Sequence, residues 1–61
     1  MTRYEAVGIA EGFVEADSEK QIIEAWQYLV DTGMAWTLQG WFGRTANHLI
    51  ENGIINKKGI A

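Results

Sequence analysis

The stretch from Asp31 to Ala46 reads DTGMAWTLQGWFGRTA. It contains two of the three Trp residues, three of the seven Gly residues and one of the five basic residues of the chain. Gly33 and Gly40 are expected to end helical turns, because glycine adopts the left-handed conformation that closes a helix without strain. Trp36 and Phe42 are expected to fill the core beside them. The stretch therefore predicts a compact junction between two helices, around which the rest of the chain is arranged.

A helix over about residues 18–32 is predicted to precede this junction. Ser18 followed by Gln21 matches a capping box, which is typical of a helix start. Asp17 and Glu19 lie where the helix dipole favours negative charge. The apolar residues recur at helical spacing and form one stripe: Ile22, Ile23, Ala25, Trp26, Leu29 and Val30.

A second helix over about residues 42–52 is predicted to follow, ended by Gly53. Residues 34–40 are too few for an ordinary helix and predict a single helical turn, for which Thr32 is a candidate cap. Gly43 costs about 1 kcal/mol relative to Ala inside a helix. Either the helix begins near Gly43, or Gly43 allows a close approach of another backbone. The predicted inner face contains Phe42, Thr45, Ala46, Leu49 and Ile50.

The segment from Tyr4 to Ala16 is predicted to be extended, as a strand or a hairpin. Val7, Ile9 and Phe13 share one face of an alternating pattern, and two glycines disfavour a helix. A single strand leaves its edges unpaired. Its partner is expected to be the C-terminal end of the chain or the same strand of a second subunit. The predicted fold is therefore α+β and mostly helical.

The length of the chain allows one domain, residues 1–61. A chain this short buries only about 60% of the surface that it exposes when unfolded, so it is marginally stable alone. It has no Cys, and 48% of its residues are hydrophobic. This apolar content favours a homodimer or a bound partner, with a tightly packed monomer as the alternative. The predicted core contains Ile22, Trp26, Leu29, Trp36, Leu38, Phe42, Ala46, Leu49 and Ile50.

The net charge of −3 argues mildly against binding to nucleic acid, which depends on basic surface. Glu11, Glu15, Asp17 and Glu19 make the N-terminal third acidic. This cluster is either a solvated face or a docking surface for a basic partner. The chain shows no signal-peptide pattern, and no apolar run approaches the ~20 residues of a membrane span. We therefore expect a cytoplasmic protein with no membrane segment.

The residue types needed for catalysis or metal binding are scarce. His48 is the only His, and Ser18, the only Ser, is better explained as a helix cap. One His without Cys makes a poor metal site. The glycines between Gly40 and Thr45 do not match a phosphate-binding loop, although the backbone near Gly43 with Arg44 is a weak candidate for holding an anion. We expect no enzymatic activity, no metal and no cofactor.

The candidate binding residues surround the second half of the junction. Arg44 either has an internal role, stacked on Trp36 or Trp41 or paired with Asp31, or it contacts a partner. Arg and Trp are the residue types that dominate interface hot spots. The sequence leaves open whether Trp41 is buried. The candidate set is Gln39, Trp41, Arg44, Thr45 and His48.

The same region contains a densely specified motif, whose residues are Leu29, Asp31, Thr32, Gly33, Ala35, Trp36, Leu38, Gln39, Gly40, Phe42, Gly43, Arg44, Thr45, Ala46, Leu49, Ile50 and Gly53. This motif resembles the small proteins of unknown function that are common in tailed-bacteriophage genomes. The resemblance implies a phage origin and expression in a bacterial cytoplasm, and it implies no particular activity.

From size, residue types and this resemblance we expect a non-enzymatic phage interaction protein. It would bind a host protein and modulate or inhibit it, with a defence component as one target class. Two alternatives stay open. One is a small nucleic-acid-binding regulator that uses Arg44, Asn47, Lys57 and Lys58. The other is a protein that sequesters a small ligand or nucleotide, with aromatic residues at a dimer interface around residues 40–45.

Overall fold

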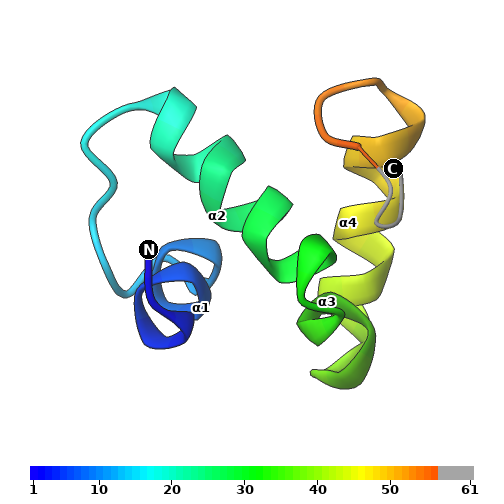
Figure 1. Cartoon of the computed structure of the whole chain (residues 1–61), viewed down its shortest axis with the longest axis horizontal. Coiled ribbons are helices and arrows are strands. Elements are labelled where there is room, and N and C mark those ends of the chain that lie inside the picture. The colour runs from blue at the N-terminus through cyan, green and yellow to red at the C-terminus, as the bar shows by residue number, and fades with distance from the viewer. Residues whose placement is uncertain (57–61) are drawn as a thin grey trace.

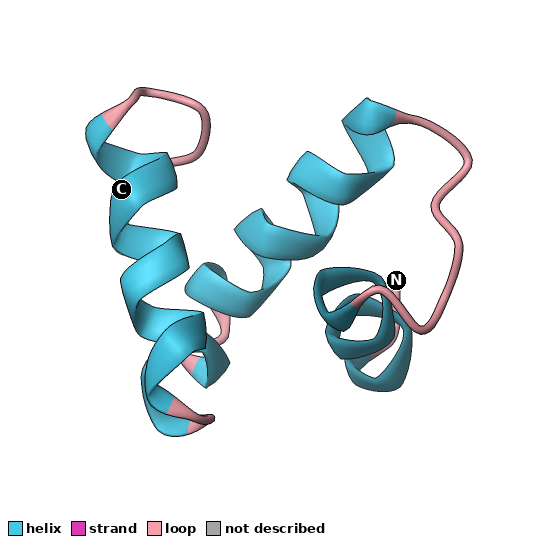
Figure 2. Cartoon of the chain, turned by 180° about the vertical axis from the view of Figure 1, so that it is seen from behind, coloured by secondary structure: helices cyan, strands magenta, loops and turns pink. Residues whose placement is uncertain are grey.

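The computed structural model describes residues 1–56, which form four helices (Figure 1). The helices are α1 (Arg3–Glu11), α2 (Glu19–Asp31), α3 (Met34–Thr37) and α4 (Gly40–Glu51). α2 lies in the middle, with α1 packed on one side and with α3 and α4 on the other (Figures 1 and 2). No strand occurs in residues 1–56, so this part of the chain is all-helical.

The prediction of an α+β fold is wrong, because the segment expected to be extended forms α1. The Thr2 hydroxyl accepts a hydrogen bond from the Glu5 backbone N–H at 3.1 Å, which caps the helix. Gly12 ends α1 with φ +85°, a left-handed conformation. Burial falls on Ala6 and Ile9, three residues apart, which is helical spacing. A helix satisfies its own backbone groups, so the unpaired edges of a lone strand do not arise.

α2 confirms the predicted main helix. The Ser18 hydroxyl accepts a hydrogen bond from the Gln21 N–H at 3.3 Å. In return the Gln21 side chain accepts from the Asp17 N–H at 2.7 Å, one residue earlier than in an ideal capping box. Gly33, at φ +81°, follows the C-cap Thr32 and turns the chain into α3.

α3 and α4 form the predicted short turn and second helix, with two differences. α4 begins at Gly40, and Gly43 lies inside it. Thr32 does not cap α3, because its hydroxyl donates back to the Tyr28 carbonyl at 2.9 Å. Gly53 has φ +74° and ends the α4 region as expected.

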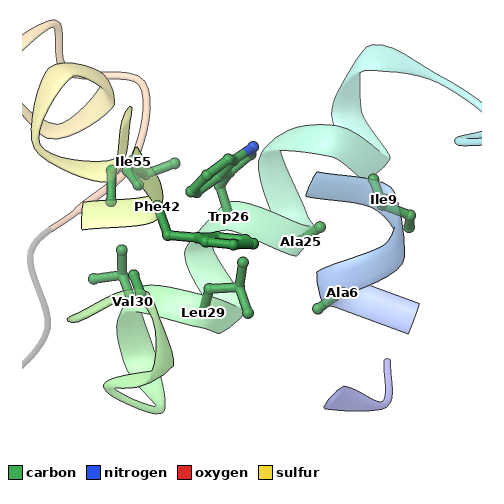
Figure 3. Close-up of a cluster of buried hydrophobic side chains, with 10 residues drawn as sticks. Ala6, Ile9, Ala25, Trp26, Leu29, Val30, Phe42 and Ile55 are labelled. Atoms are coloured by element: carbon green, nitrogen blue, oxygen red, sulfur yellow. The ribbon is translucent and has the colours of Figure 1, made fainter. Parts of the chain in front are cut away.

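The core contains four of the nine predicted core residues: Trp26, Leu29, Phe42 and Ala46 (Figure 3). Two predictions are wrong: Ile22 and Trp36 remain 41% and 43% exposed. Leu38, Leu49 and Ile50 are partly buried against the core. Six residues outside the predicted core set are also buried, and three of them are alanines: Ala6, Ile9, Ala25, Val30, Ala35 and Ile55.

Gln27 holds the segment after α4 against α2. Its side-chain Oε1 accepts from the Asn56 N–H at 2.8 Å, and its Nε2 donates to the Asn56 carbonyl at 2.9 Å. The same Nε2 donates to Asp31 Oδ1 at 2.9 Å. Ile55, next to this link, is buried in the core. The hydrogen bonds between Gln27 and Asn56 therefore hold this segment against the core, and no strand pairing is involved.

None of the helices in the described part of the chain combines the length and the apolar character needed to cross a membrane.

Candidate interaction surfaces

Four of the five predicted binding residues lie along one flank of α4, which we call the α4 flank. Trp41, Arg44, Thr45 and His48 are spaced by three, four and seven residues, so they follow one side of the helix. Gln39 immediately precedes the helix as its N-cap. The structure thus brings the predicted set together on one flank.

Trp41 has its main contacts in the core. Its ring stacks on Phe42 with centroids 4.0 Å apart and meets the edge of Trp26 at 6.2 Å. Its indole N–H donates to Gln39 Oε1 at 3.3 Å. Trp41 is half-buried, and Gln39 holds its polar edge at the surface. Gln39 and Trp41 therefore support the fold, whatever else they contact.

Arg44 is exposed and turns back over the start of α4. Its Nη1 lies 3.1 Å from the position that a Cβ would take on Gly40. Gly40 thus leaves room for the guanidinium group over the first turn. Gln39 makes no side-chain cap hydrogen bond there. Arg44 and the exposed His48 are the two charged or titratable members of the α4 flank.

Trp36 belongs to α3 and contacts α4 at Gly43. Its ring and the Ala35 carbonyl oxygen are both 3.5 Å from the position that a Cβ would occupy on Gly43. These distances are ordinary van der Waals contacts, so Gly43 lies against α3 but an alanine would also fit there. Trp36 therefore touches α4 with one edge of its ring and stays partly exposed.

Residues 1–56 contain no detected pocket, and they contain no group of three His, Cys, Asp or Glu residues placed to hold a metal. His48 is exposed near the end of α4. Lys57 and Lys58, named for the nucleic-acid alternative, lie outside the described residues. The remaining candidates of that alternative, Arg44 and Asn47, are both exposed on α4.

A second surface was missed by sequence reasoning, and it carries the most exposed aromatic side chains. Tyr4 is 89% exposed, Phe13 is 84% exposed and Val14 is 41% exposed. We call Tyr4, Gly8, Phe13 and Val14 the α1 surface.

Within the α1 surface, Tyr4, Gly8 and Val14 lie side by side, and Phe13 precedes Val14 in the chain. Tyr4 and Gly8 are one helical turn apart on α1. A Cβ on Gly8 would lie 2.5 Å from Val14 Cγ2, so the Val14 side chain rests on this glycine. The Phe13 and Val14 N–H groups both donate to the Gly8 carbonyl, at 2.9 and 3.0 Å. This turn fixes where Phe13 and Val14 leave the helix.

The sequence contained a signal for this arrangement. Thr2 followed by Glu5 fits a helix start, and Gly12 fits a helix end. Interpreting the segment as a strand instead placed Phe13 on one face with Val7 and Ile9. In α1, Ile9 is buried while Phe13 lies beyond the helix end and points away from the core.

Two exposed carboxylates adjoin the α1 surface, and we call Glu11 and Glu15 the acidic rim. Glu11 lies seven residues after Tyr4 on α1, which places it on the same face of the helix, and Glu15 follows Val14 in the chain. Asp17 and Glu19 are also exposed, but they lie at the start of α2, to which the loop leads away from α1 (Figure 1). No cationic residue occurs between Glu11 and Glu19. The α1 surface therefore combines exposed aromatic groups with adjacent negative charge.

Comparison with known proteins gives one match. A family model described as a domain of unknown function, DUF7417, matches residues 9–61. The match contains α2, α3 and α4 and begins within α1, so it leaves Tyr4 outside and includes Phe13 and Val14. No curated protein and no solved structure matches the chain.

Proposed function

The chain belongs to the DUF7417 family, whose function is unknown, and we propose that it is a non-enzymatic protein that acts by binding another protein. The observation that carries this proposal is the near-complete exposure of two aromatic side chains, Tyr4 on α1 and Phe13 in the turn that ends α1. Single exposed apolar residues are ordinary, but adjoining ones are typical of a contact surface.

The energetics favour a protein partner for this surface. Burying a large apolar side chain stabilises a complex by about 1.5–3 kcal/mol. Aromatic residues are also over-represented among the few that dominate binding. Phe13 extends from a turn fixed by two backbone hydrogen bonds to Gly8. A side chain on a fixed turn loses less conformational entropy on binding than one on a mobile loop.

The proposed biological setting is a bacteriophage protein acting in the cytoplasm of its bacterial host. It is supported by the resemblance of residues 29–53 to small tailed-phage proteins. In this setting the partner is a host protein that is modulated or inhibited, with defence components as one class. The binding surface is the α1 surface rather than the α4 flank, because Gln39 and Trp41 are already engaged with each other.

One of the two arguments for a homodimer no longer holds. It was based on a strand in need of a partner, and that segment is α1. The remaining support is the high apolar content of the chain. Light scattering on the purified chain tests this expectation directly, because it measures the mass of the particle in solution.

Capture from bacterial lysate with immobilised protein tests the proposed function. Wild type is compared with Phe13→Ser and with Arg44→Ala, and the captured partner is quantified over a range of lysate concentrations. We expect saturable capture that Phe13→Ser reduces by about tenfold or more and that Arg44→Ala leaves nearly unchanged. If wild type captures no partner saturably, the proposed function is contradicted. If Arg44→Ala abolishes capture and Phe13→Ser does not, the binding site lies on the α4 flank.

A further inference from the structure

We propose that the partner presents a cationic segment, with apolar side chains flanked by Lys or Arg, to the α1 surface. This inference rests on the proposed function and adds the chemical class of the partner. Tyr4, Phe13 and Val14 would receive the apolar side chains. The acidic rim, Glu11 and Glu15, would face the flanking cations.

The charge around the surface is one-sided. From residue 3 to residue 20 the chain carries two cationic residues, Arg3 and Lys20, against five carboxylates: Glu5, Glu11, Glu15, Asp17 and Glu19. Both cations are at the margins of this range. Arg3 also lies about 100° around α1 from Tyr4, since a helix has 3.6 residues per turn. No cationic residue thus separates the two carboxylates of the acidic rim along the chain.

Charge decides between the possible occupants of the surface. A second copy of the chain would bring two acidic rims together, and like charges facing each other across an interface oppose association. Nucleic acids and anionic lipid surfaces are repelled for the same reason. A cationic protein segment is attracted, and this attraction also raises the rate of encounter. The apolar centre with a charged rim matches the usual anatomy of a protein interface.

Selection from a library of random displayed peptides tests the partner class without knowledge of the natural partner. The full chain is the target, and the Phe13→Ser variant is the counter-target. Phe13 is almost fully exposed, so this change removes the anchor and spares the core. We expect peptides that prefer wild type by about tenfold or more, as for a hot-spot aromatic, and that carry Lys or Arg around apolar residues.

Titration of one selected peptide then tests the charge directly. We expect Glu11→Gln and Glu15→Gln each to weaken binding about two- to fivefold, as for exposed ion pairs. Added salt should reduce the difference between wild type and these variants. Glu51→Gln at the end of α4 is the matched control and should leave the affinity unchanged.

The possible results separate this inference from the function on which it rests. If the selected peptides need Phe13 for binding but are neutral or acidic, the inference of a cationic partner is wrong, and the α1 surface is still a docking surface. If no peptide distinguishes wild type from Phe13→Ser, both proposals fail. A dimer that light scattering detects in wild type and not in Phe13→Ser would make a second copy the occupant and would also overturn the inference.

Discussion

At the residue scale, Gly8 and Gln27 each connect parts of the chain that are distant in structure or sequence. Val14 packs against Gly8, and this contact fixes the direction in which the chain leaves α1. Gln27 binds both backbone groups of Asn56. Neither role was visible in the sequence, because a glycine inside a helix and a glutamine on its polar side look replaceable. Both roles depend on residues outside the helix, namely Val14 after α1 for Gly8 and Asn56 after α4 for Gln27.

Gly8→Ala is expected to destabilise the fold in spite of the better helix propensity of alanine. The new Cβ would meet Val14 Cγ2 at 2.5 Å. Such overpacking costs about 1–3 kcal/mol, whereas the propensity gain is about 1 kcal/mol. Urea unfolding should show a net loss of stability. In a Val14→Ala background the same change should be neutral or stabilising, and a loss of equal size there would contradict the contact.

Gln27→Ala is expected to lower the free energy of unfolding by about 1 kcal/mol, since it removes hydrogen bonds worth roughly 0.5–1.5 kcal/mol each from a partly exposed site. Hydrogen exchange should quicken at the Asn56 amide, whose acceptor is Gln27 Oε1. Glu24→Ala, at an exposed position of the same helix, is the control. An unchanged exchange rate at Asn56 would show that this link does not protect the segment.

At the element scale, the sequence predicted α2 well and α1 wrongly, for a physical reason. α2 has both a strong cap at Ser18 and an apolar stripe over several turns. α1 is short, contains Gly8, and buries only Ala6 and Ile9. An isolated helix of this length is marginal in water. Its helical state therefore depends on packing against α2, which local patterns do not contain.

Ala25→Leu tests whether α1 depends on this packing. Ala25 is fully buried on α2, and Figure 3 shows it facing Ala6 and Ile9 of α1. A larger side chain there forces the helices apart at a cost of about 1–3 kcal/mol. We expect faster amide exchange in α1 and reduced helical circular dichroism. Glu24→Leu adds the same side chain at an exposed position and should leave α1 unaffected.

At the scale of the whole molecule, a central helix carries neighbours on two sides, and the candidate surfaces lie on different neighbours. The α1 surface is on one side of α2, and the α4 flank is on the other (Figure 1). The sequence predicted the α4 flank because its residues are close along one helix. It did not predict the α1 surface, because exposure of Phe13 follows only when α1 and its end at Gly12 are known.

The most direct test of the account is site-specific photo-cross-linking in the bacterial host. The cross-linking amino acid p-benzoyl-phenylalanine is placed at position 13 on the α1 surface or, in a matched variant, at position 44 on the α4 flank. Both positions are exposed, so neither variant should disturb folding. The account predicts a covalent adduct with a partner protein from position 13 and little or none from position 44. An adduct from position 44 alone would contradict the central claim that the α1 surface is where this protein binds.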